Sequence, residues 1–150
     1  MIKEELNILM LEDSELDAEL NQEQLHLLEE YVCKISVIQD KDEYIKGISA
    51  SPAPDLILCD YSLPQYNGLE ALHDLNALKL NIPFIFVTGA MQEEIAADAI
   101  KAGAWDYVVK DRLFRLPLAI RNVLKLKKER DIALEAEKRT QRLLRGIDET

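Results

Sequence analysis

The chain contains four short apolar runs, each bounded by polar or turn-forming residues. They cover residues 8–11, 56–59, 84–87 and 107–109, and an acidic, hydroxyl or basic side chain follows each one directly. Runs of this length between turn residues are typical of buried parallel strands. The pattern therefore predicts a parallel sheet with polar, chemically capable side chains where its strands end.

Stretches with helical periodicity lie between the apolar runs, so strand and helix alternate along the chain. Pro83 stands near the start of one strand, where a missing amide proton is tolerated, and Gly103 follows a helical stretch as its terminator. Repeated units of this kind predict a parallel sheet covered by helices on both faces. We expect strands at residues 6–12, 34–39, 55–60, 82–88 and 105–110, and helices at 15–30, 42–50, 69–79, 92–102 and from 117 onward.

The first predicted helix has a clear start signal. Ser14 is a good N-cap residue, and Asp17 follows it at the third position. We expect the apolar side of this helix to consist of leucines, namely Leu16, Leu20, Leu27 and Leu28.

The last helical stretch is longer than a compact domain of this size needs. It begins near Pro117, a residue favoured in a first helical turn, and no helix breaker follows before Gly146. A partly apolar seam runs along it in alternating four- and three-residue steps, which leaves two alternatives open: a dimeric coiled coil, or a solvated helix that frays. The seam consists of positions 119, 123, 126, 130, 133, 137, 140, 144 and 147, of which Arg130, Glu137 and Thr140 are polar.

Composition indicates one globular domain with an extension, because 48% of the 150 residues are apolar. We expect residues 1–125 to form the domain and 126–150 a helical extension, a candidate coiled-coil connector. Residues 1–112 carry 8 Lys/Arg against 22 Asp/Glu, whereas 113–150 carry 10 against 6. An acidic body would repel phosphates, so we expect no nucleic-acid binding by the domain. The basic run is more often a solvated helix face than an anion site.

The cysteines and the lack of long apolar runs indicate the cellular compartment of the protein. Cys59 lies in a predicted strand and Cys33 directly before one, and they lack CxxC spacing, which favours buried free thiols in a reducing compartment. The N-terminus has no signal-peptide pattern, and no apolar run approaches the length that crosses a membrane. We expect a cytoplasmic protein that does not interact with membranes.

The residues that end the predicted strands bring opposite charges to one edge of the sheet. Parallel strands align their C-terminal ends, where open α/β folds bind ligands. Two like charges about 4 Å apart cost roughly 4 kcal/mol at an effective dielectric near 20, so clustered acids favour a hard cation such as Mg²⁺. A carboxylate beside Mg²⁺ can attack phosphorus, and positive charge and hydroxyl donors then hold the phosphoryl oxygens. The residues concerned are Glu12, Asp13, Asp60, Thr88 and Lys110.

Each of these residues alone has an ordinary explanation. An acid pair before a helix also serves as a cap, an aspartate after a strand is often a turn former, and a threonine in a strand reflects β-propensity. Their occurrence in this order, on successive predicted strands, favours a functional site.

The chain resembles the receiver domain of two-component response regulators over residues 5–125. The resemblance rests on Leu11-Glu12-Asp13, on residues 56–60 with Leu63-Pro64 and Gly68, and on residues 82–89 and 103–110. It implies a flavodoxin-like, doubly wound α/β fold with a parallel five-stranded sheet in the order 2-1-3-4-5 and five helices, the last one extended. It also implies phosphorylation-dependent signalling, in which a histidine kinase or phosphotransfer protein is the phosphodonor.

The same resemblance implies a role for each site residue. Asp60 would accept the phosphoryl group, and Thr88 and Lys110 would grip it. Tyr107 matches the aromatic switch residue that turns inward when Thr88 moves, altering the face formed by the fourth helix, fifth strand and fifth helix. The residues implied for Mg²⁺ are Asp13, Asp60, the backbone carbonyl of Ser62 and, largely through water, Glu12.

The chain also departs from the family pattern. Asp111 follows Lys110 where the family usually has a proline in a cis peptide, and a cis bond at a non-proline costs about 2.5–4 kcal/mol. The geometry of that loop is therefore left open. Ser62 and Ala90 occupy positions that the resemblance links to the dephosphorylation rate. Tyr66 has two explanations, a gate to the site and a plain turn aromatic, and the second is favoured.

Two other functions remain as alternatives. A Mg²⁺-dependent phosphohydrolase of the haloacid-dehalogenase type needs a second acid two residues after its nucleophile, and Ser62 at that position argues against it. A pseudo-receiver would serve only for docking or dimerisation, but all the chemical positions are occupied. A homodimer is expected to use either the face around the fifth strand or the terminal helix.

Overall fold

The computed structural model describes residues 2–89 and 93–148, and it has a parallel five-stranded sheet in the order β2-β1-β3-β4-β5. The predicted strand order is confirmed. The strands are β1 (Glu4–Leu11), β2 (Tyr31–Ile38), β3 (Leu56–Cys59), β4 (Phe84–Thr88) and β5 (Asp106–Val109). The helices are α1 (Glu15–Leu25), α2 (Lys41–Ile48), α3 (Gly68–Ala77), α4 (Glu93–Lys101), the 3₁₀ helix η1 (Lys110–Arg115) and α5 (Leu116–Asp148).

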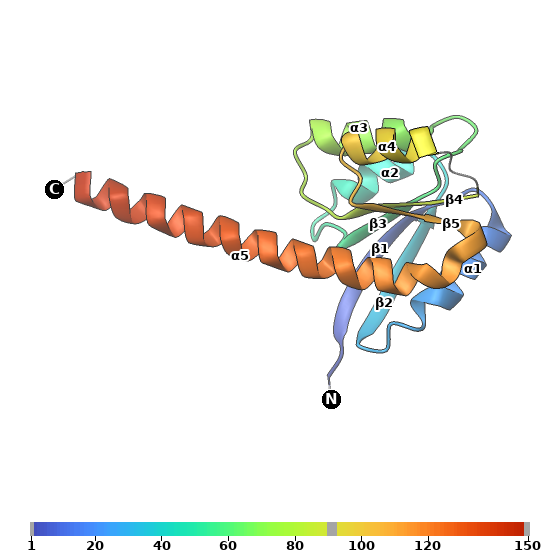
Figure 1. Cartoon of the computed structure of the whole chain (residues 1–150), viewed down its shortest axis with the longest axis horizontal. Coiled ribbons are helices and arrows are strands. Elements are labelled where there is room, and N and C mark those ends of the chain that lie inside the picture. The colour runs from blue at the N-terminus through green and yellow to red at the C-terminus, as the bar shows by residue number, and fades with distance from the viewer. Residues whose placement is uncertain (1, 90–92, 149–150) are drawn as a thin grey trace.

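Helices cover both faces of the sheet, with α2, α3 and α4 on one face and α1 and α5 on the other (Figure 1). Successive side chains of a strand point to opposite faces, so each central strand supplies both cores. In β3, Ile57 and Cys59 belong to the core beneath α2 and α3, whereas Leu56 and Leu58 belong to the core beneath α1 and α5. Burial on both faces explains why these strands read as continuous apolar runs.

The leucine side predicted for α1 is wrong for three of its four residues. Leu16, Leu20 and Leu27 are 64%, 39% and 56% exposed, and only Leu28 is buried. The helix ends at Leu25, so Leu27 and Leu28 lie in the turn that leads to β2. The buried side of the helix consists instead of Ala18, Asn21 and Leu25.

The rotation of α1 follows from its first turn. The Ser14 hydroxyl accepts a hydrogen bond from the backbone N–H of Asp17, as predicted, at 3.2 Å. The Asp17 carboxylate in turn contacts Lys110 across the top of the sheet. With Asp17 held at Lys110, Ala18, Asn21 and Leu25 face the sheet, and Leu16 and Leu20 stay outside.

The other boundaries differ from the prediction by one to three residues, apart from the turn after β5. β2 begins at Tyr31, three residues early, because α1 is shorter than expected. After β5 the chain enters η1 directly at Lys110, a 3₁₀ turn that periodicity did not predict. Gly103 ends α4 with φ +111°, a conformation that glycine adopts readily. Ala90 and Gln92, for which we made predictions, lie outside the described residues.

Helix α5 runs from the sheet into solvent as one continuous helix (Figure 1). Its first turns pack on the sheet and bury Ala119 and Val123. Farther along, Leu126 is 37% exposed, and the seam positions from Ala133 to Leu144 are exposed. The seam therefore faces its own domain at its start and solvent farther on. Within the described residues, no helix has the length and apolar character needed to cross a membrane.

The two cysteines are free, as predicted. Cys59 is buried, but Cys33 is only half-buried because β2 is an edge strand.

Candidate functional site

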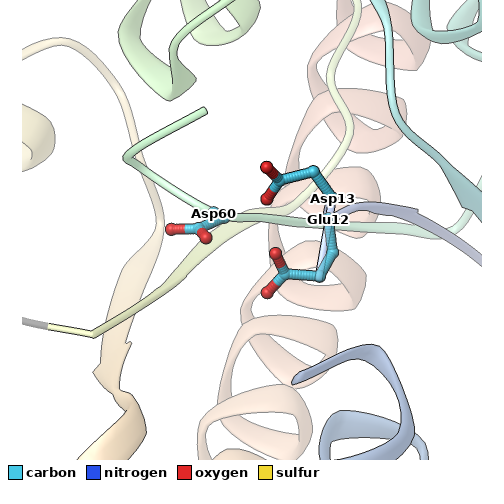
Figure 2. A group of neighbouring side chains, drawn as sticks. All are labelled: Glu12, Asp13 and Asp60. Carbon is cyan, nitrogen blue, oxygen red and sulfur yellow. The ribbon is translucent and has the colours of Figure 1, made fainter. Parts of the chain in front are cut away.

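Two neighbouring strands deliver the acidic residues to one point. Leu11 and Cys59 are partners in the parallel pairing of β1 with β3, so Glu12 and Asp60 follow their strands side by side. Backbone hydrogen bonds continue this alignment, from Asp60 N to Leu11 O at 3.0 Å and from Glu12 N to Ile38 O at 3.0 Å. Figure 2 shows Glu12 and Asp13 at the end of β1 and Asp60 beside them.

The three carboxylates form a group that fits a hard cation. One oxygen each of Glu12, Asp13 and Asp60 lies within 4.8 Å of the others. Glu12 and Asp60 are 2% and 8% exposed, whereas Asp13 is open to solvent. Carboxylate oxygens that converge from a buried floor and an open rim suit Mg²⁺, which binds through a few carboxylates and keeps several waters.

Lys110 places an ammonium group among these acids. Its Nζ donates hydrogen bonds to Glu12 Oε1 at 2.8 Å, to Asp17 Oδ2 at 2.8 Å and to Asp60 Oδ2 at 3.1 Å. The three protons of an ammonium are thus all used. This positive charge offsets part of the repulsion among the carboxylates.

Burial and neighbouring charges shift the pKa values of Glu12 and Lys110. Burial raises the pKa of Glu12 to about 7; the hydrogen bond from Lys110 opposes the rise and the charge of Asp60 adds to it. Burial works to lower the pKa of Lys110, but its hydrogen bonds to Asp17, Glu12 and Asp60 outweigh this and raise it. Lys110 therefore remains a cation at neutral pH. Glu12 is the group whose charged form the site disfavours.

The loop after β3 contributes backbone groups. The backbone N–H of Ser62 donates to Asp60 Oδ1 at 3.2 Å, while Lys110 holds Oδ2. Both oxygens of the Asp60 carboxylate are thus oriented by hydrogen bonds. The Ser62 side chain is exposed.

The two remaining predicted site residues lie on the neighbouring strands. Thr88 is the last residue of β4, is buried, and pairs in register with Val109 of β5. Tyr107 is half-buried on β5 and pairs with Phe86. Thr88 thus ends its strand at the same edge of the sheet as Asp60, and Tyr107 lies one strand farther from the acidic group.

Asp17 is a site residue that the sequence prediction missed. Its carboxylate lies as close to the Lys110 ammonium as that of Glu12, although it belongs to α1. The sequence pattern indicated only that Asp17 belongs to the helix start signal at Ser14. It lies in the first turn of the helix that directly follows the acid pair, which is the one signal that could have identified it.

The family model for the response regulator receiver domain matches residues 8–121. The chain belongs to this family. Receiver domains are signalling modules that generally are not enzymes, that bind Mg²⁺ at an acidic site and that interact with histidine kinases or phosphotransfer proteins.

Curated relatives of this receiver are longer regulators. It is 38% identical over 85 residues to the regulatory protein LuxO of Vibrio vulnificus, a match that covers 53% of this chain and 19% of LuxO. The regulatory protein AtoC of Escherichia coli is 34% identical over 74 residues, which cover 49% of this chain and 16% of AtoC. The matched part thus spans less than a fifth of each relative.

Solved structures show the same receiver fold. The signal receiver domain of a protein described as a Luxo repressor from Vibrio parahaemolyticus superposes with a TM-score of 0.76 at 27% identity, over 86% of this chain and 97% of that one. The Mn²⁺-bound form of the response regulator Rcp1 superposes with a TM-score of 0.64 at 26% identity, over 77% and 91% of the two chains.

Proposed function

We propose that Asp60 accepts a phosphoryl group from the phosphohistidine of a histidine kinase or phosphotransfer protein. The observation that carries the proposal is the position of the Asp60 carboxylate, which lies among Glu12, Asp13 and Lys110 with both oxygens oriented. A fixed carboxylate at the rim of a sheet is a suitable nucleophile for a group delivered from solvent.

The reaction is a transfer from nitrogen to oxygen. A carboxylate oxygen of Asp60 attacks phosphorus, the new P–O bond forms as the P–N bond breaks, and the imidazole of the donor leaves. The product is a mixed anhydride of phosphate and the Asp60 carboxyl group. Lys110 is positioned to turn from the Asp60 oxygen to a phosphoryl oxygen, and the Thr88 hydroxyl is proposed as the second donor.

The divalent cation proposed for this site is Mg²⁺. Glu12, Asp13, Asp60 and the backbone carbonyl of Ser62 are the groups that would hold it, directly or through water. When bound, it would neutralise the charge that gathers on the acids and on the transferred phosphoryl group. The Mn²⁺-bound state of the related regulator Rcp1 supports a divalent cation here.

The proposed output runs from Thr88 through Tyr107 to the face formed by α4, β5 and α5. Thr88 would move toward the phosphoryl group, and Tyr107 would turn into the space that it leaves. Because α5 is one continuous helix, a change at this face would reach the extension as well.

We further propose that the exposed part of α5 mediates homodimerisation. Residues 133–146 are all exposed, and a helix of this kind gains most of its stability from packing an apolar side. Sedimentation of the chain over a range of concentrations should detect a dimer. Leu144→Glu, in the seam, should weaken it, and Leu134→Glu, outside the seam, should not. If the two substitutions weakened the dimer equally, the seam would not be its interface.

The phosphohydrolase alternative is less well supported. The residue two positions after Asp60 is Ser62, which offers no acid, and its backbone rather than its side chain contacts Asp60. A pseudo-receiver is not favoured either, because Lys110 and the acids form a connected group.

A small phosphodonor tests the proposal. Incubation with acetyl phosphate and Mg²⁺ should add the mass of one phosphoryl group, and chelation of the metal should prevent the addition. Asp60→Asn should abolish the modification, whereas Asp13→Asn should slow it. Undiminished phosphorylation of Asp60→Asn would refute the proposal.

A further inference from the structure

Tyr66, in the loop between Asp60 and α3, is buried rather than an exposed turn residue. Its side chain is 6% exposed, and its hydroxyl donates a hydrogen bond to the Asp74 carboxylate of α3. Burial, together with this contact, raises the pKa of Tyr66 above its ordinary range, so the hydroxyl keeps its proton and remains a donor. The loop is therefore anchored on α3 near its far end.

A second tyrosine supports the first from α2. The ring of Tyr44 lies 5.8 Å from that of Tyr66 at a tilt of 54°, and Tyr44 is fully buried. Its hydroxyl donates to the backbone oxygen of Ala71 in α3 at 2.8 Å. Tyr66 is thus held between two helices that are themselves joined by a hydrogen bond.

The near end of the same loop carries the groups proposed for the cation. Ser62 N–H contacts Asp60 Oδ1, and the loop is closed at its base by a hydrogen bond from Gly68 N to Tyr61 O at 3.0 Å. Tyr61 also packs edge-on against Phe86, with ring centroids 5.4 Å apart. A loop closed at its base and anchored at Tyr66 leaves the Ser62 backbone few alternative positions.

We infer that Tyr66 is a positioning residue for the divalent cation of the receiver. Through its contact with Asp74, it fixes the 61–67 loop so that the Ser62 backbone carbonyl and the Asp60 carboxylate face the same point. The inference rests on the proposed function, because it assigns Ser62 to the cation. Groups that orient metal ligands typically change metal affinity by about 10–100-fold when removed, and Tyr66, which acts through four residues of backbone, is expected at the lower end.

Calorimetric titration of the full chain with Mg²⁺ tests the inference. Tyr66→Phe keeps the ring and removes only the hydroxyl, and it should raise the Kd for Mg²⁺ about 10-fold. Asp74→Asn should have a similar effect. The double variant should be no weaker than either single one, because both changes disrupt the same hydrogen bond.

Tyr44→Phe is the matched control. It removes a buried tyrosine hydroxyl that joins α2 to α3 and keeps the ring that packs on Tyr66, so it should lower the melting temperature and leave the Kd for Mg²⁺ unchanged. Equal Kd values for wild type and Tyr66→Phe would overturn the inference, as would an equal weakening in Tyr44→Phe. Failure of the wild-type chain to bind Mg²⁺ would refute the proposed function itself, and with it the inference.

Discussion

Arg130 of α5 stacks on Trp105, directly before β5, with its guanidinium carbon 4.1 Å from the centroid of the indole ring. Cation–π contacts of this kind contribute about 0.5–1 kcal/mol at exposed sites. The contact explains why a charged residue interrupts the apolar seam of the terminal helix at position 130. It also ties α5 to the strand that carries Tyr107.

Loss of this contact should be visible in tryptophan fluorescence, because Trp105 is the single tryptophan of the chain. Arg130→Ala should make Trp105 more accessible to acrylamide and lower the free energy of unfolding by about 0.5–1 kcal/mol. Lys138→Ala, farther along the exposed helix, is the control and should change neither quantity. Unchanged quenching in Arg130→Ala would show that the stacking does not persist in solution.

A methyl group at Gly68 should disturb the loop that follows Asp60. A Cβ atom there would lie 2.4 Å from Phe86 Cε1 and 2.9 Å from the backbone oxygen of Asp60. We expect Gly68→Ala to cost about 1–3 kcal/mol of unfolding free energy, measured by urea denaturation. Gly146→Ala meets no atom within 4 Å and should stabilise the helix slightly. Equal stability of the two variants would contradict the close packing at Gly68.

The fold could be predicted largely from the sequence, because the strands buried on both faces read as uninterrupted apolar runs. The predicted α1 surface failed for a physical reason. A leucine stripe indicates a buried side only when nothing else fixes the rotation of the helix, and here Ser14 and the Asp17–Lys110 contact fix it.

The site was predictable as far as it depends on strand ends. Glu12, Asp60, Thr88 and Lys110 end or directly follow strands of one sheet, so topology alone brings them to one edge. Asp17 and Tyr66 were missed in these roles because their contacts depend on how a helix and a loop pack, and no periodic pattern records this.

Removal of the Lys110 charge should destabilise the metal-free protein. Lys110→Met leaves the Glu12 and Asp60 carboxylates without the ammonium that bonds both of them. Breaking an ion pair of this kind costs about 3 kcal/mol when the remaining charge is buried. Thermal unfolding with chelator and with Mg²⁺ should show a larger stabilisation by Mg²⁺ in the variant than in wild type. A variant as stable as wild type under chelation would contradict this account of the charges.

The metal-free protein should also lose stability as the pH rises from about 5 to about 7. The pKa of Glu12 is about 7 in the folded chain against an ordinary 4.5, so in this window the folded state holds a proton that the unfolded state has released. Glu12→Gln cannot titrate and should lack this part of the pH dependence. Unfolding free energies of both proteins in chelator would reveal it, and parallel pH profiles would contradict the raised pKa.

The most direct test of the central claim is to locate the phosphoryl group on the chain. After reaction with acetyl phosphate and Mg²⁺, reduction with borohydride converts an aspartyl phosphate to homoserine, which peptide mass spectrometry can assign to one position. The account predicts homoserine at position 60 and none at Asp13 or Asp17. Reduction at another carboxylate, or a phosphoryl group that resists borohydride and hydroxylamine, would contradict it.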